Sequence, residues 1–146
     1  VDNGSDRTAR WEMMMASTEG ALAFVKGLGA VHSMSHAAGR IKELRLHHGT
    51  LNAVILPTIL RFNEEACLDV YPRLRQAMGL AANADLAKAV EQLNADLGLP
   101  RGLSEMGLTE ELIEDMVPHA INDLATMTNP KKVSAEDFAD LYRQAM

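Results

Sequence analysis

Residues 49–62 have the sequence GTLNAVILPTILRF, which is a nearly continuous apolar stretch. A surface helix keeps one polar face, whereas this stretch is apolar on almost every side, as in a helix that is covered all round. A central strand is the alternative, but the stretch is longer than a typical strand and Pro57 is poorly tolerated in one. We therefore predict a central helix, in which Pro57 leaves the carbonyl oxygen of Ala53 without its helical partner and favours a kink.

The composition of the 146-residue chain favours helices on both sides of this stretch. There are 21 Ala and 19 Leu against 8 Val and 5 Ile, which suits helices better than sheets. With 47% hydrophobic and 23% charged residues, the chain is of the ordinary globular kind and not of the disordered kind. Its length fits one domain with its own core.

Charge and cysteine content exclude several classes of protein. A net charge of −6 repels nucleic acids and anionic membrane surfaces, and no apolar run is long enough to span a bilayer. Cys67 is the only cysteine, so no intrachain disulfide can form, and the first residues do not resemble a signal peptide. We expect no nucleic-acid or membrane partner and a cytoplasmic location.

Apolar residues three or four apart, together with turn residues, predict further helices over 6–26, 30–40, 71–79, 83–97, 109–125 and 134–144. Asn83 and Thr109 are the expected N-caps of their helices. Ser134, with Asp137 three residues later, resembles a capping box. Residues 99–107 are expected to form a loop. The predicted fold is one all-α bundle of six or seven helices.

The first of these helices, 6–26, has an amphipathic pattern. Its methionines, Met13, Met14 and Met15, and Met34 of the next helix are flexible apolar residues that fill cores or line pockets. Core filling is the expected role for each.

Four of the five histidines lie between residues 32 and 48. His32 and His36 are four residues apart, which places both imidazoles on one helix face within reach of one metal ion. Histidines that are simply hydrogen-bonded in a core often have the same spacing, so both interpretations stay open. Gly29 and Gly39, on either side, either allow a ligand or a helix to approach closely or mark the two helix ends.

Three stretches around these histidines resemble the signature of the iron-containing (group III) alcohol dehydrogenases: GLGAVHSMSHAAG at 27–39, HHGTLNAVILP at 47–57 and RFN at 61–63. Residues 120–130 are similar to the family's C-terminal helices, so the resemblance covers essentially the whole chain. It implies the fold of the family's helical C-terminal domain. The connection from His36 to His48 is slightly longer than in many members, which affects the expected shape of the loop only.

The resemblance implies a role for each histidine. His32 and His48 would each give one imidazole to a catalytic divalent metal, Fe²⁺ in first place or Zn²⁺, and His36 would be a catalytic residue that does not bind the metal. Such an ion polarises an alcohol oxygen while hydride leaves for the nicotinamide of NAD or NADP. Asn52 either orients His48 or is a polar residue satisfied by backbone. His47 is expected to contribute shape or a solvent contact.

The family's two other ligands, an Asp and a His spaced D-x-x-x-H, are missing from the expected place. Asp115 and His119 have this spacing but follow the histidine cluster, so we interpret them as a coincidence. The α/β domain that binds most of the dinucleotide in the family is also missing. We therefore expect residues 1–146 to be one helical domain that supplies half of the metal site of an NAD(P)-linked alcohol dehydrogenase and is inactive alone.

The expected partners are a small alcohol or aldehyde, the N-terminal α/β domain of the same enzyme and a second copy of the chain. Two other interpretations stay open. The chain could belong to a related maleylacetate reductase or glycerol dehydrogenase-like enzyme. It could also be a non-catalytic helical module, derived from the family, that serves dimerisation or partner binding.

Overall fold

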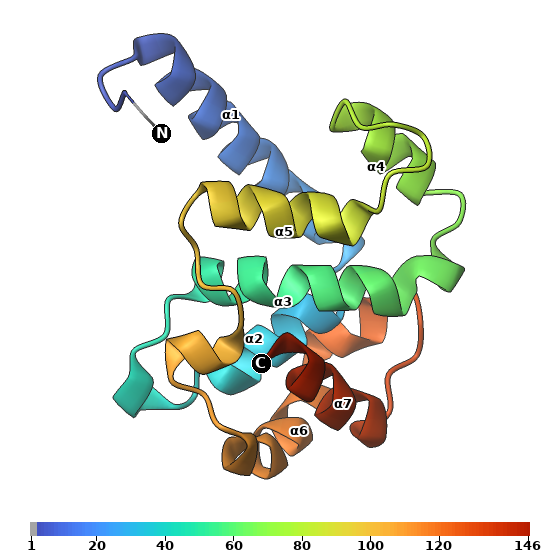
Figure 1. Ribbon diagram of the computed structural model, residues 1–146. Helices are drawn as coiled ribbons and strands as arrows, with labels where there is room; N and C mark the ends of the chain where they lie inside the picture. Colours follow the sequence, from blue (N-terminus) through green and yellow to red (C-terminus); the bar gives the residue numbers. More distant parts are fainter. Residues whose placement is uncertain (1–2) are drawn as a thin grey trace.

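The computed structural model describes residues 3–146, and every regular element in this range is helical (Figure 1). The predicted all-α bundle is therefore confirmed. None of the helices in this range combines the length and apolar character that a bilayer crossing needs. The α-helices are α1 (Arg7–Ala23), α2 (Gly29–Ala38), α3 (His48–Asn63), α4 (Tyr71–Ala77), α5 (Leu86–Asp96), α6 (Ile113–Ile121) and α7 (Ala135–Ala145). Short 3₁₀ turns join them: η1 (Phe24–Lys26), η2 (Lys42–Leu44), η3 (Glu64–Ala66), η4 (Leu103–Met106), η5 (Glu110–Leu112) and η6 (Leu124–Thr128).

Helix α3 is the central helix of the bundle, as its apolar sequence predicts. It packs against α2, α5 and α7, and Leu51 and Ile55 are fully buried. The gap that Pro57 leaves in the helical hydrogen bonding is closed from another helix. The side-chain amide of Asn94 on α5 donates to the carbonyl oxygen of Ala53 at 2.7 Å. Helix α5 therefore satisfies the backbone group that the proline leaves free.

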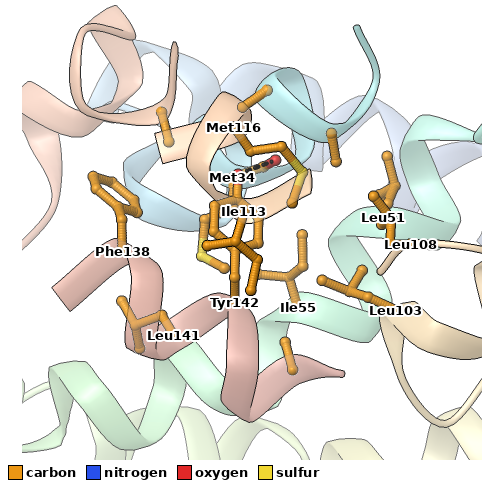
Figure 2. Close-up of a cluster of buried hydrophobic side chains, with 14 of the residues drawn as sticks. Met34, Leu51, Ile55, Leu103, Leu108, Ile113, Met116, Phe138, Leu141 and Tyr142 are labelled. Atoms are coloured by element: carbon orange, nitrogen blue, oxygen red, sulfur yellow. Dashed lines mark hydrogen bonds between the residues drawn. The ribbon is translucent and has the colours of Figure 1, made fainter. Parts of the chain in front are cut away.

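The main core lies where α2, α3, α6 and α7 meet (Figure 2). Its largest fully buried side chains include Tyr142, Phe138, Met34 and Met116. The Tyr142 hydroxyl donates to the carbonyl oxygen of Met34 at 2.9 Å, which ties α7 to α2. Burial raises the pKa of Tyr142, so the phenol remains a neutral donor. The expected core role of Met34 is confirmed.

The structure confirms one of the predicted helix caps and contradicts another. Ser134 and Asp137 form the predicted capping box at the start of α7. The expected N-cap at Asn83 is wrong: Asp85 caps α5, because its carboxylate accepts the N–H of Lys88. Both residues are good N-caps by type, and the structure uses the one directly before the apolar helix.

The predicted helix over 109–125 is also shorter in the structure. The side chain of Thr109 makes no capping hydrogen bond, and a 3₁₀ turn precedes α6. At the other end the Asn122 amide donates to the carbonyl of Pro118, and Asp123 adopts an extended backbone conformation that stops the helix. Residues 99–107, expected to be loop, contain the short turn η4.

Helix α1 forms where the sequence predicts it, but its packing was wrongly predicted. Asp6 caps it by accepting the N–H groups of Thr8 and Ala9, yet no residue of α1 is buried. Met13 and Met14 are 68% and 65% exposed, so they do not fill the core. Met15 is 38% exposed. The reason is visible in Figure 1, where α1 projects from the bundle.

Candidate active site: a histidine cluster on α2 and α3

Two glycines allow a C-terminal turn to approach the beginning of α2. Gly27 has φ +100°, and a Cβ atom there would overlap the side chain of Thr128. Gly29 has φ +74°, and its Cβ atom would lie 3.1 Å from Oδ1 of Asn129. The same oxygen accepts the N–H of Ala30 at 3.0 Å, which caps the first turn of α2. The glycines thus serve a close contact that fixes where α2 begins.

Helices α2 and α3 bring three imidazoles together. His32 and His36 lie one turn apart on α2, with ring centroids 5.7 Å apart, as their spacing predicts. His48 is the first residue of α3, and its ring centroid lies 5.3 Å from that of each of the other two. The ring of His48 stacks on that of His36 at an interplanar angle of 16°.

Two ring nitrogens of this cluster face the same side chain. Nε2 of His48 lies 3.0 Å and Nε2 of His32 lies 3.4 Å from the amide nitrogen of Asn52. An amide NH₂ can donate to both, which leaves a lone pair on each Nε2 and the proton of each ring on Nδ1. Nδ1 of His48 lies 3.4 Å from the Ser35 hydroxyl. Asn52 therefore contacts the imidazoles, and not backbone, through its amide nitrogen.

The environment favours the neutral form of both imidazoles. Burial lowers the pKa of His32, and the neighbouring rings of His48 and His36 lower it further. Burial also lowers the pKa of His48, with His36 and His47 adding to the effect. A metal ligand must be deprotonated, so these shifts favour the ring form that can bind a metal near neutral pH.

His36 differs from its two neighbours in its hydrogen bonding. Its Nδ1 lies 2.9 Å from Oδ2 of Asp123, which is 87 residues away in the sequence. Neither spacing nor residue type in the sequence connects Asp123 with the histidines. It lies inside the stretch 120–130 on which the family resemblance partly rests.

The remaining histidines lie outside this arrangement. Nδ1 of His47 accepts the N–H of Thr50, so this side chain caps α3. Asp115 and His119 are exposed on α6. Within residues 3–146 no three His, Cys, Asp or Glu side chains come together as a metal-binding group. The cluster thus offers two converging nitrogen donors, fewer than a zinc or iron site takes from its protein.

Three comparisons show what the chain is similar to. The family model described as "Fe-containing alcohol dehydrogenase family, C-terminal" matches residues 1–146. A 4-hydroxybutyrate dehydrogenase of Cupriavidus necator is 48% identical over 99% of the chain. An NAD-dependent methanol dehydrogenase of Bacillus methanolicus is 35% identical over 100% of it. In both cases the chain spans only 40% of the relative.

Solved structures agree. A crystal structure of a 1,3-propanediol oxidoreductase matches with a TM-score of 0.74 and 30% identity, covering 81% of this chain and 32% of that one. An alcohol dehydrogenase from Oenococcus oeni matches with a TM-score of 0.72 and 29% identity, again over 81% of this chain and 32% of that one. The family and the fold expected from the sequence are confirmed. The chain belongs to the iron-containing alcohol dehydrogenase family and corresponds to its C-terminal domain.

Proposed function

We propose that this chain is the helical part of a metal-dependent, NAD(P)-linked alcohol dehydrogenase and supplies two of its metal ligands, His32 and His48. The observation that carries the proposal is the convergence of their Nε2 atoms on Asn52, at 3.4 and 3.0 Å. Such an enzyme converts an alcohol and NAD(P)⁺ to an aldehyde or ketone, NAD(P)H and a proton.

The residues present fit a divalent ion. Oδ1 of Asn52 is buried and has no hydrogen-bond partner among the described residues, so the polar group between the two imidazoles is incompletely satisfied. Neutral imidazoles suit Fe²⁺, our first choice from the family, and also Zn²⁺. The bound ion would supply a Lewis acid that polarises the alcohol oxygen. Its other ligands, and most of the NAD or NADP site, would come from the remainder of the enzyme.

The exposed apolar side chains of helix α1 also favour a longer enzyme. Trp11 is 61%, Leu22 69% and Phe24, just after the helix, 56% exposed, and exposed large apolar side chains can mark a surface that another part of the protein covers. We propose that the N-terminal part of the same enzyme covers them, since the matched relatives are much longer than this chain. We also propose that the enzyme is a homo-oligomer. We propose a cytoplasmic location because Cys67 is the only cysteine of the chain, so no intrachain disulfide can form.

The substrate is a small alcohol. The relative with 48% identity is named for 4-hydroxybutyrate, so this hydroxy acid is the first to assay, followed by methanol and 1,3-propanediol. Oxidation of 4-hydroxybutyrate by NAD⁺ gives succinate semialdehyde, NADH and a proton.

Metal content and turnover of the full-length protein test the proposal. We expect His32→Ala and His48→Ala each to abolish stoichiometric metal binding and NADH formation. His119→Ala, which removes an exposed histidine of α6, should leave both unchanged. Activity that persists without metal would favour a maleylacetate reductase type of enzyme. A folded, metal-free and inactive protein would favour the non-catalytic module. Steady turnover by the 146-residue chain alone would refute the division of the site between two parts of the enzyme.

A further inference from the structure

Asp123 holds the ring of His36 from a fixed backbone position. Its Oδ2 lies 2.9 Å from Nδ1 of His36, while its Oδ1 accepts the N–H of Ala125 at 2.8 Å. The side chain of Asp123 is 22% exposed and that of His36 is 40% exposed. Because each carboxylate oxygen has its own partner, rotation of the carboxylate would break one of the two contacts.

This arrangement selects one tautomer of His36. An ionised carboxylate can only accept hydrogen bonds, so Nδ1 of His36 must carry the proton that it donates. In the neutral ring Nε2 then keeps its lone pair. The same ring stacks on His48, so its plane is fixed next to one of the two proposed ligands.

A purely structural role for the pair is a poor explanation, because other contacts already join α2 to the same C-terminal segment. The Thr126 and Ser33 hydroxyls are hydrogen-bonded at 2.7 Å, and Asn129 accepts the N–H of Ala30 at 3.0 Å. These contacts do not depend on the tautomer of His36.

We infer that Asp123 is the positioning residue of the active site: it fixes the ring plane and the tautomer of His36 so that Nε2 is an acceptor during alcohol oxidation. This inference rests on the proposed function for its catalytic consequence. The tautomer itself follows from the contacts of Asp123 alone.

Asp123→Asn in the full-length enzyme is the decisive change. The N–H of Ala125 requires an oxygen, so the new amide oxygen stays there and the NH₂ group faces His36. A donor at this place forces Nδ1 to accept, and the proton moves to Nε2. We expect kcat to fall about 10- to 100-fold, the range for partners that orient active-site imidazoles, with KM and metal content nearly unchanged.

Asp140→Asn is the matched control. It makes the same change of charge on α7, where Asp140 pairs with Arg143 on the surface, and should leave kcat unchanged. Asp123→Ala removes the acceptor without adding a donor, so it should give a mixture of tautomers and a smaller loss of kcat. It also serves as the test if Asp123→Asn does not fold.

The second measurement is independent of activity. In metal-free, full-length protein with ¹⁵N-labelled histidine, NMR correlation of ring nitrogens with ring protons reports the tautomer, and His36→Gln assigns the signal. We expect Nδ1–H in the wild type and Nε2–H in Asp123→Asn. An unchanged tautomer, or a kcat within about twofold of wild type, overturns the inference. A wild-type enzyme without metal or turnover overturns the proposed function instead, and the tautomer would still report on Asp123.

Discussion

The hydrogen bond from Asn94 to Ala53 gives a sharp test of how the central helix tolerates its proline. Pro57 has no N–H, so the carbonyl of Ala53 lacks its helical donor and depends on the amide of Asn94 at 2.7 Å. Asn94→Ala removes that donor and should destabilise the protein. Replacing Pro57 with alanine returns a backbone N–H to α3, so the amide should then be much less important.

The expected magnitude follows from the surroundings of the carbonyl. Leaving a buried polar group unsatisfied costs about 1–3 kcal/mol. Here Ala53 is only half-buried, and Asn94 and Pro57 line an open cavity of about 610 Å³, so the lower part of the range applies. We expect Asn94→Ala to lower the free energy of unfolding by about 1–1.5 kcal/mol. In the Pro57→Ala background the cost should fall to about 0.5 kcal/mol or less, a coupling energy of roughly 1 kcal/mol.

Urea unfolding followed by far-UV circular dichroism measures all four proteins of this double-mutant cycle. Asn83→Ala, an Asn-to-Ala change at an exposed turn position, is the control and should alter stability by less than about 0.5 kcal/mol. If Asn94→Ala costs the same with and without Pro57, the hydrogen bond does not compensate for the proline and the reasoning is wrong.

Two further changes probe other parts of the fold. Gly27→Ala combines a positive φ with an overlap on Thr128, so we expect the free energy of unfolding to fall by at least about 2 kcal/mol; an unchanged melting temperature would contradict it. Asp137→Asn should cost about 1 kcal/mol at pH 7. Hydrogen bonds from Ser134 lower the pKa of Asp137 in the folded state, so its contribution is complete above the unfolded pKa. The contribution is lost as the pH falls through the folded pKa. The difference between variant and wild type should therefore shrink below about pH 4, and a constant difference down to pH 2 would refute this cause.

The sequence predicts the fold well where the physics is local. The apolar run of α3 indicates a covered helix, and the missing N–H of Pro57 predicts a free carbonyl at Ala53. The donor that satisfies this carbonyl, Asn94, lies on another helix, 41 residues away. Its identity depends on how α5 packs against α3, and no local pattern contains that information.

Helix α1 shows the opposite limit. Its periodicity and the N-cap Asp6 predict a helix correctly, because both are properties of the segment itself. The same periodicity also suggested that Met13 and Met14 are buried. An amphipathic pattern indicates that one face of the helix packs against something. It does not say whether the rest of this chain provides that contact. In the part of the chain that the structure describes, both side chains are exposed.

The candidate site was predicted only in part. The i, i+4 spacing places His32 and His36 on one face, whereas the role assigned to His48 came from the family resemblance. Neither source predicts that Asn52 faces both His32 and His48, or that Asp123 pairs with His36. Both contacts join residues of different elements, so their geometry exists only once the helices have packed.

The contacts of α2 with the segment 123–129 show how the bundle controls this geometry. Asp123 contacts His36 near the end of the helix, Thr126 contacts Ser33 in its middle, and Thr128 and Asn129 contact Leu28 and Ala30 at its start. Asn129 also pairs with Asn63 at the end of α3 through two amide hydrogen bonds of 3.1 and 2.8 Å. The helix that carries His32 and His36 and the helix that carries His48 are thus held by one segment. A displacement of that segment would shift α2 relative to α3 and separate the two Nε2 atoms, although their hydrogen-bond partner is Asn52 and not a residue of the segment.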